Sequence, residues 1–141
     1  MKIEIAQMPF AKQKGVYTII ERQPFIIIKE DLHPVTRSIV IAHELGHHML
    51  HKAELKKTPT LQEFNIFDMT DNHIEYEANV FVAELLVDES SLIELIHQKK
   101  SIDEIAKALF VDPTLISLKV RLLIDKGYDY IPQDYDSKFL K

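Results

Sequence analysis

Residues 34–52 have the sequence PVTRSIVIAHELGHHMLHK, and this stretch says more about the fold than any other. Its apolar positions recur at spacings of three and four, which predicts one continuous helix. On a helix, His43 and His47 lie one turn apart on the same face, so both imidazole rings can bind one metal ion. Glu44 follows His43 directly. This pattern is typical of a catalytic zinc site, where the carboxylate takes a proton from water that zinc has acidified to a pKa of about 7.

Two further features support the helix. Pro34 suits a first-turn position, where its missing N–H costs nothing. The apolar stripe consists of Val35, Ile39, Ala42, Leu45 and Met49. Gly46 lies inside the helix, where glycine is less favourable than alanine by about 1 kcal/mol. We expect this glycine to let another element approach the helix beside the two histidines.

A catalytic zinc site usually has three protein ligands, so the chain should supply one more. The best candidate is Glu75, on a second predicted helix that begins near residues 70–73 and runs to about residue 87. Asn79 lies one turn later on the same face, where it can hydrogen-bond the free nitrogen of a ligand histidine. The other candidates are Glu77, His73 and Asp71. A third histidine in the pattern H-E-x-x-H-x-x-G-x-x-H is excluded, because position 53 is alanine.

Together the two motifs resemble the signature of the ImmA/IrrE-type metallopeptidases (the M78-like family). That signature is HELGH followed by a helix of the form E-x-E-A-N-x-F-A-x-x-L-L. This chain has HELGHHMLH at residues 43–51 and EYEANVFVAELL at residues 75–86. The resemblance implies that His43, His47 and Glu75 bind one zinc ion and that Glu44 is the catalytic base. It also implies a small gluzincin-like enzyme that cuts a helix-turn-helix repressor of a phage, mobile-element or stress-response operon.

The chain departs from the family pattern at two positions. Val82 replaces the usual small residue after Phe81, and Asp88 replaces the proline that often follows the two leucines. Neither residue is a candidate ligand, so the departures concern packing and not chemistry.

The sequence before the metal-binding helix predicts three strands, at residues 2–6, 16–20 and 25–29, which we expect to form a small antiparallel sheet. Together with the helices, this indicates an α+β fold of minimal zincin-like type. We expect a zincin-like catalytic core at residues 1–88, a helical extension at 89–128 and a tail at 129–141. The stretch 53–72 is long enough for a functional loop.

The helical extension predicts short helices at residues 91–98, 101–110 and 114–126. Ser101 and Glu104 are spaced as a capping box, and Gly127 is a typical helix stop. The last two helices resemble a helix-turn-helix in pattern. However, the second of them offers only Lys119, Arg121 and Lys126 as cations. We therefore expect no direct nucleic-acid binding, and packing or partner docking instead.

The composition sets broader bounds. The chain has 141 residues, of which 46% are hydrophobic, so one ordinary domain can bury a core. Its net charge of −5 argues against a broad phosphate-binding surface. It has no cysteine, so any metal must use His, Asp or Glu. No signal-peptide pattern and no apolar run long enough to cross a bilayer is present, so we expect a soluble cytoplasmic protein without membrane contacts.

These features predict an intracellular zinc-dependent endopeptidase acting on one protein partner. We expect its substrate to lie extended along an exposed edge of the strand at residues 25–29. The competing hypothesis is a non-catalytic regulatory protein that sequesters a repressor or a toxin-like partner. The intact Glu44 argues against it, because binding alone does not require that carboxylate.

The other histidines have less specific interpretations. We expect His48 to turn away from the metal, and His51 to interact with the helix C-terminus or pack beneath the site. Four residues are open candidates for stabilising an oxyanion: His73, Tyr17, Tyr128 and Tyr135.

Overall fold

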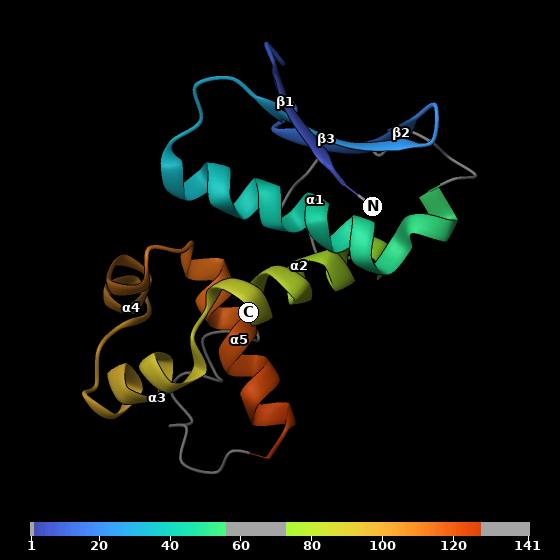
Figure 1. Cartoon of the computed structure of the whole chain (residues 1–141). Coiled ribbons are helices and arrows are strands. Elements are labelled where there is room, and N and C mark those ends of the chain that lie inside the picture. The colour runs from blue at the N-terminus through green and yellow to red at the C-terminus, as the bar shows by residue number, and fades with distance from the viewer. Residues whose placement is uncertain (1, 56–72, 128–141) are drawn as a thin grey trace. The chain divides into compact units, whose positions relative to one another are not determined.

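The computed structural model describes residues 2–55 and 73–127, and these ranges contain three strands followed by five helices (Figure 1). The strands are β1 (Glu4–Met8), β2 (Gly15–Ile20) and β3 (Gln23–Lys29). The helices are α1 (Pro34–Leu55), α2 (His73–Leu86), α3 (Glu89–His97), α4 (Ile102–Leu109) and α5 (Pro113–Asp125). The α+β fold class is thereby confirmed.

The chain divides into two compact units, residues 1–81 and residues 82–141, with the boundary inside α2. The functional division into a core at 1–88, an extension at 89–128 and a tail at 129–141 stays a prediction. Most of the suspected loop at 53–72 lies outside the described residues, and so does the tail.

The sheet is mixed, with the strand order β1-β3-β2. β2 and β3 form an antiparallel pair, whereas β1 and β3 are parallel. The expectation of a purely antiparallel sheet is therefore wrong for one of the two pairings. The reason is that β3 lies between β1 and β2. The hairpin turn makes β3 antiparallel to β2, and β3 therefore runs in the same direction as β1.

The central place of β3 also overturns the expected substrate edge. Residues 25–29 of β3 pair with β1 on one side, and most of β3 pairs with β2 on the other. Its backbone groups are therefore already hydrogen-bonded within the sheet, and no edge remains there for a peptide.

A two-residue turn joins β2 to β3. Its residues Glu21 and Arg22 both have positive φ, at 48° and 70°, which matches the twist that a tight hairpin needs. β3 then begins at Gln23, two residues earlier than expected, and includes Pro24. Proline is tolerated there because pairing with β1 starts only at Phe25, so the strand has one neighbour at that point.

The core of the first unit lies between the sheet and α1, which contacts β2 and β3 (Figure 1). Alternate residues of β3 are buried, as expected for a strand with one face on a core. The buried apolar side chains are Val16, Tyr17, Ile26, Ile28, Ile39, Val40 and Ala42. At Gly15 the sheet approaches the helix so closely that an added Cβ would lie 2.5 Å from Val40 Cγ1.

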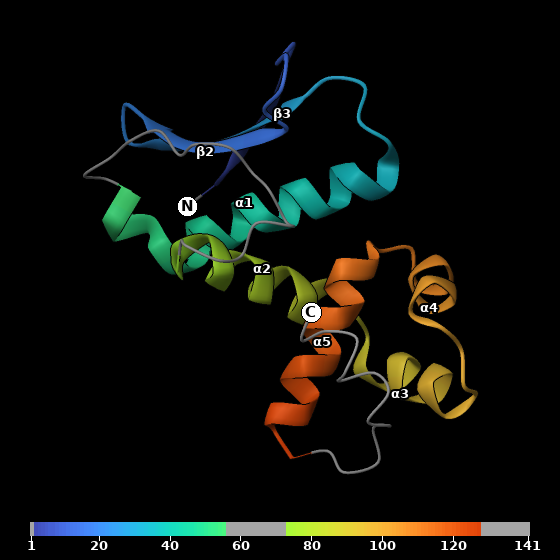
Figure 2. The same cartoon turned by 180° about the vertical axis from the view of Figure 1, so that it is seen from behind.

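The N-terminal part of α2 lies alongside α1 (Figure 2). The closest approach is at Gly46, where a Cβ would lie 3.1 Å from the Phe81 ring. This confirms the expectation that the glycine admits another element to the helix beside the two histidines.

The helices of the second unit begin with well-formed caps. Asp88 accepts a hydrogen bond from the Ser91 N–H and so starts α3, which explains the aspartate at this position. The capping box of Ser101 and Glu104 is confirmed at the start of α4. Gly127, with φ of +92°, follows α5.

The second unit has its own apolar core, which includes Leu92, Ile96, Ile105, Leu115, Ile116, Val120 and Leu123. Lys119 is 4% exposed and donates to the Glu84 carboxylate at 2.9 Å. This contact lowers the pKa of Glu84, and Lys126 adds to the effect from 3.6 Å. One of the few cations of α5 is thus used in a contact within the unit.

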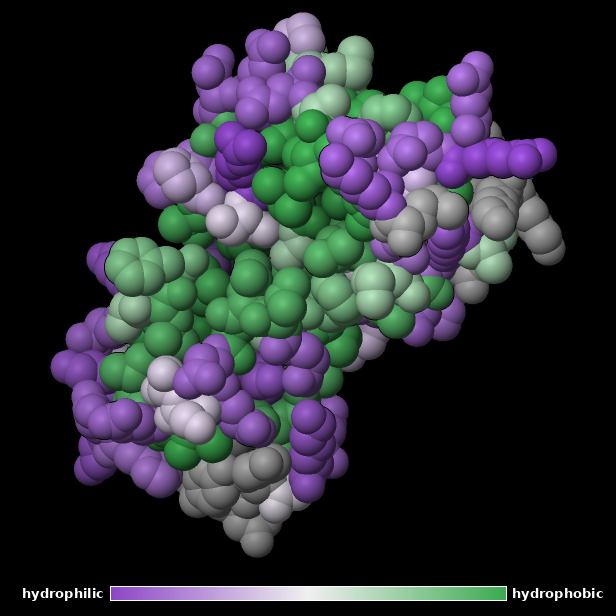
Figure 3. Space-filling view, viewed as in Figure 1, coloured by the Kyte–Doolittle hydropathy of each residue, from purple (hydrophilic) through white to green (hydrophobic). Residues whose placement is uncertain are grey.

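The surface in Figure 3 alternates between hydrophilic and apolar areas. The large apolar side chains that are most exposed include Phe110, Met49, Leu85, Ile5, Ile20 and Leu50. Among the described helices, none combines the length and the hydrophobicity needed to cross a bilayer.

The contact at Gly15 predicts a specific packing conflict. Gly15→Ala should destabilise the protein by about 1–3 kcal/mol, because the added methyl group would overlap the buried Val40 side chain. In a Val40→Ala background the same change should cost less, because the clashing methyl group is gone. Urea unfolding of the four proteins in this cycle measures the difference. Equal costs in both backgrounds would contradict the close approach.

Candidate metal centre

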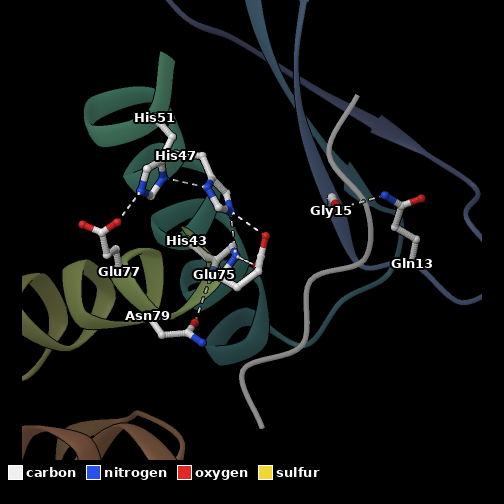
Figure 4. A network of polar contacts seen from close by, with 8 residues as sticks. All are labelled: Gln13, Gly15, His43, His47, His51, Glu75, Glu77 and Asn79. Atoms are coloured by element: carbon white, nitrogen blue, oxygen red, sulfur yellow. Dashed lines mark hydrogen bonds and ion pairs between the residues drawn. The ribbon is translucent and has the colours of Figure 1, made fainter. Parts of the chain in front are cut away.

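Three potential metal ligands meet between α1 and α2 (Figure 4). His43 Nε2 lies 2.8 Å from Glu75 Oε2, and His47 Nε2 lies 3.2 Å from Glu75 Oε1. The two Nε2 atoms are 3.1 Å apart. Both histidines are about 1% exposed, and Glu75 is 13% exposed. The structure thus brings together the three residues that the sequence singled out.

The spacing of these atoms suits a zinc ion. Two ligand atoms at about 2.0–2.1 Å from a tetrahedral zinc ion lie about 3.3 Å apart. The nitrogen–nitrogen and nitrogen–oxygen separations of 3.1 and 3.2 Å are close to that value. Two imidazoles and one carboxylate also form a donor set that zinc accepts in catalytic sites. The group can therefore hold a metal ion with little rearrangement.

Glu44 lies on a different face of α1 from the two histidines, toward the start of β2. Its side chain is 1% exposed, and its Oε2 atom has no hydrogen-bond partner among the described residues. Burial and the nearby Glu75 carboxylate raise the pKa of Glu44 to about 8, although the Tyr17 N–H opposes the shift. A buried carboxylate with a free oxygen is suited to exchange a proton with a bound molecule near neutral pH.

Glu75 has the opposite electrostatics. Burial alone raises the pKa of Glu75, but hydrogen bonds and charge from His43 and His47 outweigh it and lower the pKa to about 2. Burial lowers the pKa of His47, with the Glu75 hydrogen bond acting against it. Glu75 is therefore an anion over the whole neutral range, which a cation between the three side chains would stabilise.

Asn79 lies one turn after Glu75 and contacts the first histidine from behind. Its Oδ1 atom is 2.8 Å from His43 Nδ1, and the residue is fully buried. An amide oxygen can only accept, so His43 donates from Nδ1, and its Nε2 would be the unprotonated ligand atom once a metal replaces the hydrogen bond to Glu75. This is the contact that the position of Asn79 on the helix suggested.

The second histidine contacts His51, which packs beneath the site as one of its two expected placements, although its hydrogen bonds were not predicted. His47 Nδ1 lies 3.1 Å from His51 Nδ1, and His51 Nε2 lies 3.3 Å from Glu77 Oε1 (Figure 4). The signal was present, because His43, His47 and His51 are spaced four apart on one helix. Glu77 bonds to His51 and His73, whereas Glu75 bonds to His43 and His47.

Among the described residues, the other histidines and the tyrosine discussed from the sequence form hydrogen bonds or ion pairs away from the three potential ligands. His48 Nδ1 lies 2.8 Å from the Tyr17 hydroxyl. The Tyr17 pKa is raised by burial, so the phenol stays neutral at physiological pH. His73 is 80% exposed and lies 3.0 Å from Glu77. Gln13 donates to the Gly15 carbonyl at 3.3 Å, which holds the start of β2 (Figure 4). Asp71, Tyr128 and Tyr135 lie outside the described residues.

The raised pKa of Glu44 predicts a pH effect on the stability of the metal-free protein. Between pH 4.5 and about 8 the folded protein keeps a proton on Glu44 that the unfolded chain releases. This group therefore lowers the free energy of unfolding as pH rises, by up to about 1.4 kcal/mol per pH unit. Glu44→Gln should remove the loss. Denaturation in the presence of a chelator at pH 5, 6.5 and 8 measures both proteins, and parallel pH profiles would contradict the shift.

The comparisons with known proteins agree with this geometry. Residues 1–118 match the family Peptidase_M78, described as the IrrE N-terminal-like domain. A relative from Bacillus phage phi105, named "Uncharacterized immunity region protein 2", is 32% identical over 105 residues. The match covers 74% of this chain and 64% of the relative, so the chain spans somewhat less than two thirds of that protein's length. The family match over most of the chain leads to one conclusion: the chain belongs to the M78 peptidase family with the IrrE N-terminal-like domain.

Proposed function

We propose that this chain is an intracellular zinc-dependent endopeptidase that cleaves a helix-turn-helix repressor. In this proposal His43, His47 and Glu75 hold one zinc ion, Glu44 is the catalytic base, and Asn79 orients His43. The observation that carries the proposal is the convergence of two imidazole nitrogens and a carboxylate within 3.2 Å of one another, in a family of peptidases.

Zinc in such a site supplies Lewis-acid chemistry: it polarises a peptide carbonyl and lowers the pKa of water to about 7. Glu44 then does the proton transfer. Its carboxylate takes the proton from the attacking water and passes it to the amide nitrogen as the C–N bond breaks, so the carboxylate is regenerated. In the metal-free site a pKa of about 8 keeps Glu44 largely protonated at pH 7. The positive charge of a bound zinc ion would lower that pKa and favour the carboxylate that acts as the base.

The position of β2 supports a proposal for the substrate path. β2 is an edge strand among the described strands, and its first residues approach Glu44. We place the peptide beside the start of β2, because this end of the strand lies against the Glu44 carboxyl group. The start of β2 would then hold the scissile bond close to Glu44.

The nature of the partner rests on the phage relative, whose name assigns it to an immunity region. Phage immunity depends on repressors, and a protein that cuts one would end repression. We infer a helix-turn-helix repressor of a phage, mobile-element or stress-response operon as the substrate of this chain. The second unit would dock it. Lys119, the central cation of α5, is buried against Glu84, which supports a role in protein contacts and not in DNA binding.

The ligand assignment makes a prediction about metal content. Purified protein should contain one zinc ion per chain, and Glu75→Ala should lose it, because two imidazoles alone leave the ion short of a charged ligand. His73→Ala is the matched control on the same helix, since the exposed His73 side chain contacts Glu77 and neither His43 nor His47. It should still take up one equivalent when zinc is in excess. Full zinc in Glu75→Ala would overturn the assignment.

The role of Glu44 makes a prediction about activity. Glu44→Gln should keep the fold and the zinc but cleave the repressor about 10²–10⁴-fold more slowly, because the amide cannot accept the proton. The assay incubates each protein with a helix-turn-helix protein found encoded beside its gene and identifies any fragments by mass spectrometry. Undiminished cleavage by the glutamine variant would refute the mechanism. Equal, tight binding by both proteins with no cleavage by either would establish instead a regulatory protein that sequesters its partner.

A further inference from the structure

A line of hydrogen bonds leads from His47 to the surface of α2 (Figure 4). His47 Nδ1 contacts His51 Nδ1 at 3.1 Å, and His51 Nε2 contacts Glu77 Oε1 at 3.3 Å. His47 and His51 are 1% and 2% exposed, whereas Glu77 is 43% exposed. The line thus starts at a buried metal-facing ring and ends at a carboxylate in contact with solvent.

The Glu77 carboxylate at one end of this line determines which ring nitrogens of His51 and His47 carry a proton. An ionised carboxylate only accepts hydrogen bonds, so His51 must donate from Nε2 to Glu77. A neutral His51 then has an unprotonated Nδ1, which can only accept. His47 therefore donates from Nδ1 to His51, so with a metal bound its Nε2 would be unprotonated and would face the ion, His43 and Glu75. That is the tautomer a metal ligand needs. The reverse order of protons would place a hydrogen on His47 Nε2 and block the metal.

We propose that His51 and Glu77 are positioning residues for the metal centre, which hold His47 in the metal-binding tautomer and orientation. The proposal rests on the metal site described under the proposed function. Neither residue touches the metal or the substrate; both act through His47.

The two ligand histidines would then be held by different means. His43 is held by the neutral amide of Asn79 at 2.8 Å, whereas His47 is held through a second imidazole by a charged carboxylate. A carboxylate behind a ligand histidine increases the basicity of the ring and so strengthens its bond to the metal. Solvent around Glu77 screens this charge, so the hydrogen bond to His51 matters more than the charge itself.

Burial makes His51 the sensitive member of the pair. If its ring is replaced by an apolar side chain, the His47 Nδ1–H is left buried without an acceptor, and the ring can turn or change tautomer. Asparagine offers a test of this cause, because its Oδ1 atom occupies nearly the same position as the Nδ1 atom of histidine. His51→Asn keeps an acceptor for His47 while removing the bond to Glu77.

The first experiment measures the affinity of the full chain for Zn²⁺ by competition with a chromophoric chelator. His51→Leu should weaken binding about 10- to 100-fold, and His51→Asn should restore most of the loss. A role in packing alone would give the opposite order, because leucine fills an apolar space better than asparagine does. Circular dichroism of each metal-free variant verifies the fold.

The second experiment concerns Glu77 and keeps the proposal testable if His51→Leu does not fold. Glu77→Ala should weaken Zn²⁺ binding, and the visible spectrum of the Co²⁺-substituted protein should change because the His47 ring is no longer held. His73→Ala is the matched control. His73 contacts the same Glu77 oxygen at 3.0 Å but is 80% exposed and lies outside the line to His47, so both readouts should be unchanged.

The outcomes separate this proposal from the proposed function. If the unaltered chain binds no zinc, the metal site itself is refuted. If it binds zinc tightly and both Glu77→Ala and the His51 variants bind it equally well, only the positioning role is refuted. Equal weakening by Glu77→Ala and His73→Ala would also refute it, because a general surface effect would then explain both.

Discussion

The pairing of Glu75 with His43 and His47 is the constraint on which the rest of the first unit depends. Three polar side chains from two helices meet in a space that is almost closed to water. Such groups are costly to bury unless each has a partner of suitable charge. Here the carboxylate satisfies both rings, with its pKa lowered to about 2 by them. The arrangement is stable only if α1 and α2 are held in one relative position.

Two glycines permit that position. Gly46 lets the Phe81 side chain reach the surface of α1 beside the histidines, and Gly15 lets the edge of the sheet reach Val40 on another face. The same helix thus contacts the sheet with Val40 and Glu44 and contacts α2 with its histidines. Because successive helix residues are rotated by about 100°, Glu44 can face the sheet while His43 faces α2. The chemistry of the site is a consequence of this division of α1 between two neighbours.

The environments of the two glutamates are complementary. Glu75 is stabilised as an anion, whereas Glu44 is destabilised as one by burial and by Glu75 itself. Two carboxylates with pKa values pushed in opposite directions are a common sign of divided roles, one structural or ligating and one in proton transfer. The membership of the M78 peptidase family is consistent with that division.

Much of the fold follows from local sequence, because its signals act over a few residues. The period of the apolar positions in α1, the capping box at Ser101, the proline at the start of α5 and the glycine after it each depend on neighbours within one or two turns. The spacing of His43 and His47 is local in the same sense. The chain alone therefore determined the helices, the α+β class and the family.

Only the tertiary structure decided which distant groups meet. The central place of β3 depends on how β1 and β2 lie on either side of it, and alternating hydrophobicity is the same for a central strand and an edge strand. The bond from His51 to Glu77 joins residues 26 positions apart, and nothing within one turn of either residue specifies it. Likewise, whether a pKa is raised or lowered depends on burial and on charges from other elements. Local sequence determines which side chains a helix presents on each face, and tertiary packing determines what each of those side chains contacts.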